Sequence, residues 1–377
     1  MIYNEGNEVA VMELKELKKQ LKEYMAIPRV SGYEKEMAYR LKEDLGKYSD
    51  EVKIDRIGNV IATFKGSQKG APSLMIFAHM DTIGFVIKRI DPDGFIYVDR
   101  VGGVPEKILT GTPVRVGSED GKYYDGIFGT RAYHIMSNEE KAKADSLNDL
   151  FIDIGATSEK QLHELGIEVG CPVAYGKAYY ELLNDRISGS YIDAAAGLCN
   201  LVQLAEYMKK NPPKATVYLV GTVWEEYSAR GAMIANRSAK SDLAISILGP
   251  GAADTPDQRG KVSNVKMNNG VGVTMFNFHG KGTLNGNIIH KGIFELLKEC
   301  AEKSGISIPR QAARGALSDT AYLALEDEGI PCMDMGTPDR YSHSTLELID
   351  TKDLLETGKL LCEFVKNLDK TFDLNRY

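Results

Sequence analysis

The feature that most constrains the fold of this chain is an apolar run, Leu74 to Ala78, that ends at His79 and Asp81. A continuous apolar run of this length is typical of a strand buried on both faces of a sheet. Side chains two residues apart on a strand share a face, so His79 and Asp81 can point together into a cleft. The sequence therefore predicts a buried strand with an imidazole and a carboxylate at its carboxyl end.

Helix and strand patterns alternate around this strand. Amphipathic helices are predicted at Met12 to Met25 and Glu34 to Leu45, and two strands flank a turn at Gly58-Asn59. Further along the chain, strands are predicted in "ATVYLVGTV" and "LAISIL", and helices at 194–209, 230–235, 291–304, 320–327 and 352–368. This alternation predicts an α/β fold in which a mixed sheet is sandwiched between helices.

The pattern of predicted elements changes between residues 85 and 180. Short strands such as "GFVIKRI" and "GFIYVDR" are separated there by Asp-Pro-Asp-Gly, Gly-Gly and Glu-Asp-Gly turns. The chain has 377 residues, which is more than one core usually supports. We therefore expect an inserted small β-rich domain at 85–180, with 1–84 and 181–377 forming the main domain.

Composition excludes several classes of function. The net charge of −7 argues against binding to nucleic acid or to an anionic membrane, because such surfaces repel acidic proteins. The five cysteines are scattered without a CxxC motif, which indicates buried thiols in a reducing compartment. The N-terminus lacks a secretion signal pattern, and no stretch approaches the ~18 apolar residues that a membrane span needs. We expect a cytoplasmic protein.

Several polar residues at the ends of predicted elements are candidates for a site, and each has an ordinary alternative. His79 alone is compatible with a hydrogen-bonded core histidine, and His343, in a polar loop, with an exposed one. Asp193 could bridge metal ions or simply cap the following helix. Glu225 and Glu226 end a buried strand, and both reach one cleft only if the chain leaves the strand there. A solvated acidic pair is the alternative.

Taken together, these residues resemble a site for two metal ions. Such a site needs a bridging carboxylate, for which Asp193 is suited, and it activates a water for attack on a carbonyl. Asp81 would accept the second N–H of His79 and fix its tautomer, while one glutamate binds metal and the other transfers protons. No site is assigned to the remaining histidines, which are His134, His163, His279 and His290.

The order of these motifs resembles the glutamyl and tetrahedral aminopeptidases, a family of co-catalytic metallopeptidases that form large shells. The resemblance covers most of the chain and includes "VSGYEKEM", "DRIGNVIATFKG" and a long stretch from "GIFGTRAYH" to "GIEVGCPV". That stretch looks like the family's inserted dimerisation domain. The resemblance implies a zinc-aminopeptidase-like fold, peptide substrates, two divalent ions per subunit, zinc or cobalt, and dimers that assemble into a dodecamer.

The resemblance also implies roles for individual residues. Glu225 would be the general base, and Asp81 would orient His79. His79 would bind one metal, Asp193 would bridge both, and the second metal would be held by Glu226 and His343.

The chain departs from the family pattern at one expected metal ligand. The family usually carries an acidic residue where this sequence has Ile247 or Leu248, so the resemblance implies a weakened first metal site. Asp254 is a candidate substitute. The rival hypotheses are a single-metal or inactive sibling of the same fold, a glycosidase that uses Glu225 and Glu226, and a scaffold protein without catalysis.

Overall fold

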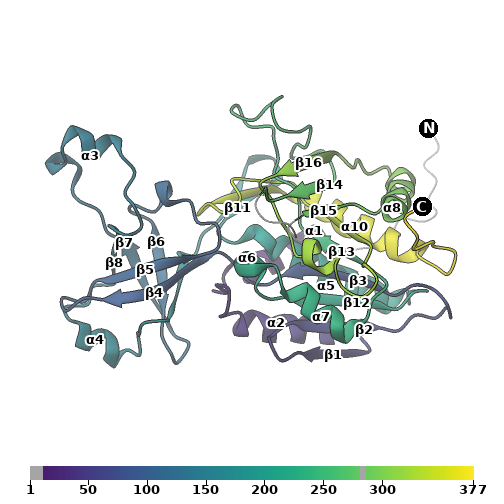
Figure 1. The fold of residues 1–377 in the computed structure, drawn as a ribbon, viewed down its shortest axis with the longest axis horizontal. Helices are drawn as coiled ribbons and strands as arrows, with labels where there is room; N and C mark the ends of the chain where they lie inside the picture. The colour runs from purple at the N-terminus through teal and green to yellow at the C-terminus, as the bar shows by residue number, and fades with distance from the viewer. Residues whose placement is uncertain (1–11, 281–285) are drawn as a thin grey trace.

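A large sheet forms the centre of the protein. The computed structural model describes residues 12–280 and 286–377 (Figure 1). The sheet has nine strands, and the four central strands, β12, β3, β13 and β17, run parallel. In spatial order the strands are β1 (Glu51–Ile54), β2 (Val60–Phe64), β12 (Val217–Thr222), β3 (Leu74–His79), β13 (Leu243–Ile247), β17 (Cys332–Gly336), β14 (Gly272–Phe278) and β15 (Gly286–Ile288), with β16 (Arg310–Arg314) also paired to β14.

Helices cover both faces of this sheet, as the fully buried strand β3 predicts. Leu74, Ile76 and Ala78 of β3 join the larger core cluster, whereas Met75 and Phe77 join a second cluster on the opposite face. The helices of the larger cluster are α1 (Leu14–Met25), α2 (Lys35–Gly46), α5 (Ile192–Lys210), α8 (Lys291–Ser304) and α10 (Thr351–Asn367). The helices of the second are α7 (Gly231–Ala239) and α9 (Thr320–Leu323). The predicted α/β sandwich is confirmed.

A closed barrel is inserted after β3. It projects to one side of the main sheet and encloses its own hydrophobic cluster (Figure 1). Its strands, in order around the barrel, are β4 (Gly84–Ile90), β5 (Ile96–Val101), β8 (Ile152–Asp153), β7 (Tyr123–Phe128), β6 (Pro113–Gly117) and β9 (Pro172–Tyr175). The short helices that accompany them are η1 (Glu106–Ile108), η2 (Tyr133–Ile135), α3 (Asn138–Ala142) and α4 (Glu159–Glu164).

A second, four-stranded sheet lies beside the first. Its order is β10 (Tyr179–Leu182), β11 (Arg186–Gly189), β19 (Glu347–Asp350) and β18 (Asp339–Arg340), with the short helix η3 (Leu183–Asp185) between its first two strands. The sequence did not predict β18 and β19, because their polar surroundings resemble a loop. They form because β19 pairs antiparallel with β11, which is far away in sequence.

One predicted helix is shorter than expected. The helix predicted at 320–327 ends at Leu323, because Leu325 and Glu326 donate to carbonyls only three residues back, as in successive turns. The N-terminal residues 1–11, to which the prediction of a missing secretion signal applies, lie outside the described residues.

Two further features of the structure concern membrane-spanning helices and cysteines. Within the described ranges, no helix combines the length and apolarity that crossing a bilayer requires. All five cysteines are free and buried, as the sequence predicts.

The close contact between α5 and the sheet leads to a prediction about stability. A Cβ atom at Gly197 would lie 2.6 Å from the carbonyl oxygen of Ile247 and 2.9 Å from the Cβ of Ala78. Gly197→Ala should therefore lower the free energy of unfolding by about 1 to 3 kcal/mol, measured by urea denaturation. Gly251→Ala, which enters open space, is the control and should be nearly neutral. Equal stability of the two variants would contradict this packing.

Candidate metal centre

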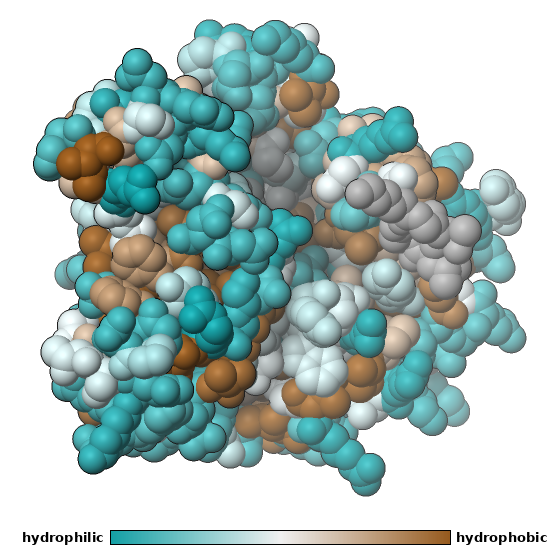
Figure 2. All heavy atoms as spheres, turned by 60° about the vertical axis from the view of Figure 1, so that its left-hand side comes forward, coloured by the Kyte–Doolittle hydropathy of each residue, from teal (hydrophilic) through white to brown (hydrophobic). Residues whose placement is uncertain are grey.

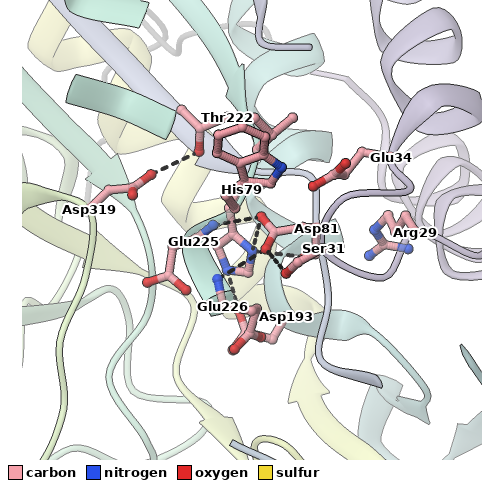
Figure 3. Close-up of polar contacts among 12 residues, drawn as sticks. Arg29, Ser31, Glu34, His79, Asp81, Asp193, Thr222, Glu225, Glu226 and Asp319 are labelled. Carbon is pink, nitrogen blue, oxygen red and sulfur yellow. Dashed lines mark hydrogen bonds and ion pairs between the residues drawn. The ribbon is translucent and has the colours of Figure 1, made fainter. Parts of the chain in front are cut away.

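His79 ends β3 at the carboxyl edge of the parallel strands, where α/β folds place their sites. Its Nε2 lies 2.9 Å from Oδ1 of Asp193, and its Nδ1 lies 3.0 Å from the backbone carbonyl oxygen of Asp81 (Figure 3). The carboxylate of Asp81 is farther from Nδ1, at 3.9 Å. The Asp81 main chain, rather than its side chain, thus makes the close contact with the imidazole.

The side chain of Asp81 instead holds the turn that carries the two glutamates. Its Oδ1 accepts from the backbone N–H of Glu225 at 2.9 Å, and its Oδ2 accepts from that of Glu226 at 3.0 Å (Figure 3). The turn forms because the chain leaves β12 at Thr222 and passes through Trp224 in the left-handed region, with φ of 64°. The single helical turn that follows, α6 (Glu225–Ser228), lines the cavity described below.

Asp193 and His343 are held by a second buried carboxylate. Glu347 of β19 accepts from the backbone N–H of Asp193 and from that of His343, each at 3.0 Å. Asp193 has extended backbone angles at the start of α5, so its side chain points toward His79 and not back to cap the helix. The pairing of β19 with β11 therefore fixes two candidate site residues at once.

His343 reaches the same place from the loop between β18 and β19. Its Nε2 lies 3.4 Å from Oε2 of Glu226 and 4.0 Å from Oδ2 of Asp193. Its Nδ1 lies 3.0 Å from the backbone carbonyl oxygen of Gly103, which follows β5 of the barrel. The inserted barrel therefore contributes directly to the orientation of this imidazole.

The side chains fit a divalent cation. One potential ligand atom each from His79, Asp193 and Glu226 lies within 4.8 Å of the others. Imidazole nitrogen and carboxylate oxygen are ligands that zinc and related transition metals accept. The chain thus offers the donor atoms of a metal centre.

Burial shifts the protonation of these groups. Burial raises the pKa of Glu225 well above its usual value and that of Glu226 to about 7. Burial alone lowers the pKa of His79, but the negative charge of Asp193 outweighs it and raises that pKa well above its usual value. Burial would raise the pKa of Asp193, but the charge of His79 lowers it to about 2. A bound cation would relieve the repulsion among these carboxylates.

A fully buried cation lies behind the site. The guanidinium of Arg29, which is 0% exposed, donates to the carbonyl oxygens of Tyr24 and Tyr191 at 2.9 and 2.8 Å. Burial lowers its pKa to about 10, so it stays charged at neutral pH and acts on Glu347 and Asp81. The positive charge of Arg29 therefore lies near the two carboxylates that hold the site residues.

The site opens into a cavity of about 870 Å³, which Asp193, Glu225, Glu226 and His343 line together with Gly103 and Leu248.

Ile247 ends β13 and is 3% exposed in the apolar core. Asp254 is engaged elsewhere, because its carboxylate accepts two hydrogen bonds from Arg340 at 2.7 and 2.8 Å. Neither residue lines this cavity.

Three residues in or near the site were not predicted from the sequence, namely Glu347, Asp319 and Gly103. Glu347 and Asp319 are buried carboxyls, and Asp319 accepts from the hydroxyl of Thr222 at 3.0 Å. An acidic residue beside apolar residues in "LELID" was the available signal for Glu347. Nothing in the sequence around Gly103 indicates its contact, which depends on how the barrel is placed.

Comparison with known proteins identifies the family of this chain. The sequence profile of the M42 glutamyl aminopeptidases matches residues 58–360. The chain is 31% identical over 360 residues to the lysyl aminopeptidase of Pyrococcus furiosus, which covers 93% of this chain and 98% of that protein.

Solved structures give the same result. The aminopeptidase APDkam598 from Desulfurococcus kamchatkensis matches with a TM-score of 0.88 and 30% identity, over 95% of this chain and 97% of that one. The Pyrococcus horikoshii TET1 peptidase, which can assemble into a tetrahedron or a large octahedral shell, matches with a TM-score of 0.81 and 25% identity, over 93% of this chain and 100% of that one. This chain belongs to the M42 glutamyl aminopeptidase family, as the resemblance predicted.

The buried acids lead to a prediction about pH and stability without metal. Burial, with the charge of Asp81, raises the pKa of Asp319 from 3.8 to about 7. Folding therefore favours the protonated form of Asp319, and this stabilisation is full below about pH 4 and is lost as the pH rises through about 7. In excess chelator, the free energy of unfolding of the wild type should fall between pH 5 and 8. In Asp319→Asn this fall should be smaller by at least about 1.4 kcal/mol, which corresponds to a shift of one pKa unit.

Thermal and urea unfolding across this pH range would measure the effect. The matched control is Asp149→Asn, at an exposed aspartate of the barrel domain, which should follow the wild type. A pH dependence that Asp319→Asn leaves unchanged would contradict the buried environment of Asp319.

Proposed function

We propose that this protein is a metal-dependent aminopeptidase that removes N-terminal residues from peptides. The observation that carries the proposal is the convergence of His79, Asp193 and Glu226 within 4.8 Å of one another, beside Glu225 and at one cavity. Membership in an aminopeptidase family supports the same class of reaction. The cavity is open enough to admit the end of a peptide, and its acidic residues attract the free amine of the substrate.

Each site residue has a proposed role. His79 and Asp193 would hold one ion, zinc or cobalt, and Glu226 and His343 a second, with Asp193 shared between them. Asp81 and Glu347 act as positioning residues, because they fix the backbone of the others. Divalent ions in such a site lower the pKa of a water and polarise the scissile carbonyl.

Glu225 is the proposed general base. It lines the cavity, and its burial raises its carboxyl pKa toward the range in which proton transfer is efficient. Glu225 takes the proton of the attacking water and returns it to the leaving amine. The hydrogen bond from its own N–H to Asp81 keeps the start of the turn in place while the side chain acts.

A single-metal or inactive sibling of this fold is the second candidate, and a specific observation favours it. The resemblance implies an acidic residue at Ile247 or Leu248, and both are apolar; Leu248 lines the cavity together with Asp193. Two ions per subunit support the aminopeptidase proposal, and one or none supports this candidate. Activity that survives a chelator would instead revive the glycosidase hypothesis.

The proposal includes a homo-oligomer. Exposed hydrophobic residues on the barrel offer surface for a second copy, namely Ile108, Ile127, Tyr133, Ile135 and Val169. Figure 2, in which the barrel side comes forward, shows scattered hydrophobic patches on a mainly hydrophilic surface. The proposal that dimers of this chain build a dodecamer is supported by the solved dodecamer of PhTET1-12s and by the shells that the TET1 peptidase can form. A cytoplasmic location and a dimerisation role for 85–180 belong to the same proposal.

The proposed base leads to a direct test of activity. Purified protein loaded with zinc, cobalt or manganese should hydrolyse members of a panel of aminoacyl-anilides and short peptides. Glu225→Gln should lower kcat by about 10²- to 10⁴-fold, because it removes proton transfer without removing a proposed ligand. Its metal content should equal that of the wild type. Folded protein that is inactive with every metal would contradict the proposal.

The contact from the barrel leads to a second prediction. A Cβ atom at Gly103 would lie 2.9 Å from Nδ1 of His343, so Gly103→Ala should displace this imidazole. We expect the affinity for one metal ion to fall by about 10- to 100-fold in a calorimetric titration, as for other residues that orient a ligand. Gly46→Ala, at the end of α2, is the control. Unchanged affinity in Gly103→Ala would show that His343 binds no ion.

A further inference from the structure

A second, smaller cavity lies against the wall of the candidate metal centre. It encloses about 30 Å³, which is enough for one water molecule or one ion. Apolar or small residues form most of its wall, among them Ile247, Leu248 and Gly249. Of the described residues that line it, only Asp193 and Asp339 carry charge, and both are acidic.

Asp339 and its neighbour Arg340 are joined to the loop that follows β13. Asp339 begins β18 and forms a bridge with Gly251, and its carbonyl oxygen accepts from the N–H of Ala252 at 2.6 Å. Its neighbour Arg340 binds the carboxylate of Asp254 through two hydrogen bonds. These contacts join β18 to the loop that follows β13, and Asp339 and Leu248 both line the small cavity.

One oxygen of the Asp339 carboxylate lacks a hydrogen-bond partner within the described part of the chain. Its Oδ2 is shielded from solvent and accepts no hydrogen bond from any described residue. The negative charge of Asp193 acts on it, and Asp193 and Asp339 both border the larger cavity as well. A buried carboxylate oxygen without a donor is costly, and two acids at one small cavity repel each other unless a cation lies between them.

We propose that Asp339 is a further metal ligand, which binds the ion held by His79 and Asp193 from the side of Leu248. This inference rests on the proposed metal centre. In this chain the carboxylate comes from β18 rather than from the end of β13, where Ile247 and Leu248 are apolar. Asp254 does not serve, because Arg340 occupies both of its oxygens. The first metal site is therefore complete and not weakened.

The test counts metal ions and does not depend on peptidase activity. Wild-type protein and Asp339→Asn are dialysed, titrated with cobalt(II) by calorimetry, and analysed for metal per subunit by mass spectrometry. The wild type should hold two ions, and Asp339→Asn should lose at least about tenfold in affinity for one of them. Asp149→Asn, at an exposed aspartate of the barrel, is the control and should keep both.

Two further measurements separate coordination from charge and from misfolding. Asp339→Asn with Leu248→Asp places a carboxylate on another residue that lines the same cavity and should restore the second ion. The visible spectrum of cobalt(II) should change in Asp339→Asn and recover in the double variant. Equal affinities in Asp339→Asn and wild type would overturn the inference, as would a double variant that folds but binds no better than Asp339→Asn.

These outcomes also distinguish this inference from the proposed function. A protein that holds two ions, loses one in Asp339→Asn and cleaves no peptide would contradict the aminopeptidase proposal alone. An active aminopeptidase whose Asp339→Asn variant keeps both ions would contradict only the role of Asp339.

Discussion

Two buried carboxylates, each accepting from two backbone N–H groups, hold the candidate site together. Asp81 fixes Glu225 and Glu226, and Glu347 fixes Asp193 and the loop of His343. Removing either acceptor would leave buried backbone N–H groups without a partner, which is costly in the interior. The main chain therefore places side chains from three separate parts of the sequence, at Asp193, at Glu225 and Glu226, and at His343.

This arrangement explains why the fold needs its second sheet and its barrel. The parallel strands bring His79 and the glutamate turn to one edge of the large sheet. β19 brings Glu347 to the same edge through its pairing with β11. The barrel adds the carbonyl of Gly103, which contacts His343. A site built from three substructures depends on their relative placement, so the stability of the fold and the geometry of the site are linked.

The sequence predicted the parts of this structure that depend on local patterns. The apolar run before His79 identified the central strand, and the paired glutamates after β12 identified the turn, because both signals lie within a few residues. Glu347, Gly103 and Asp339 were not identified, since their roles come from partners more than 100 residues away or from another substructure. The orientation of the Asp81 side chain could not be predicted from the sequence either. Its spacing from His79 predicted a contact with the imidazole, but its carboxylate accepts from the backbone N–H groups of the glutamates.

The central claim is that divalent ions bind beside Glu225, with His79, Asp193, Glu226 and His343 as ligands. The most direct measurement is an anomalous difference map from crystals of the full chain grown with zinc or cobalt. The account predicts strong peaks between these four side chains, at about 2.0 to 2.2 Å from their nitrogen and oxygen atoms. A map without a peak at this cavity, at saturating metal and with the chain folded as described, would contradict it.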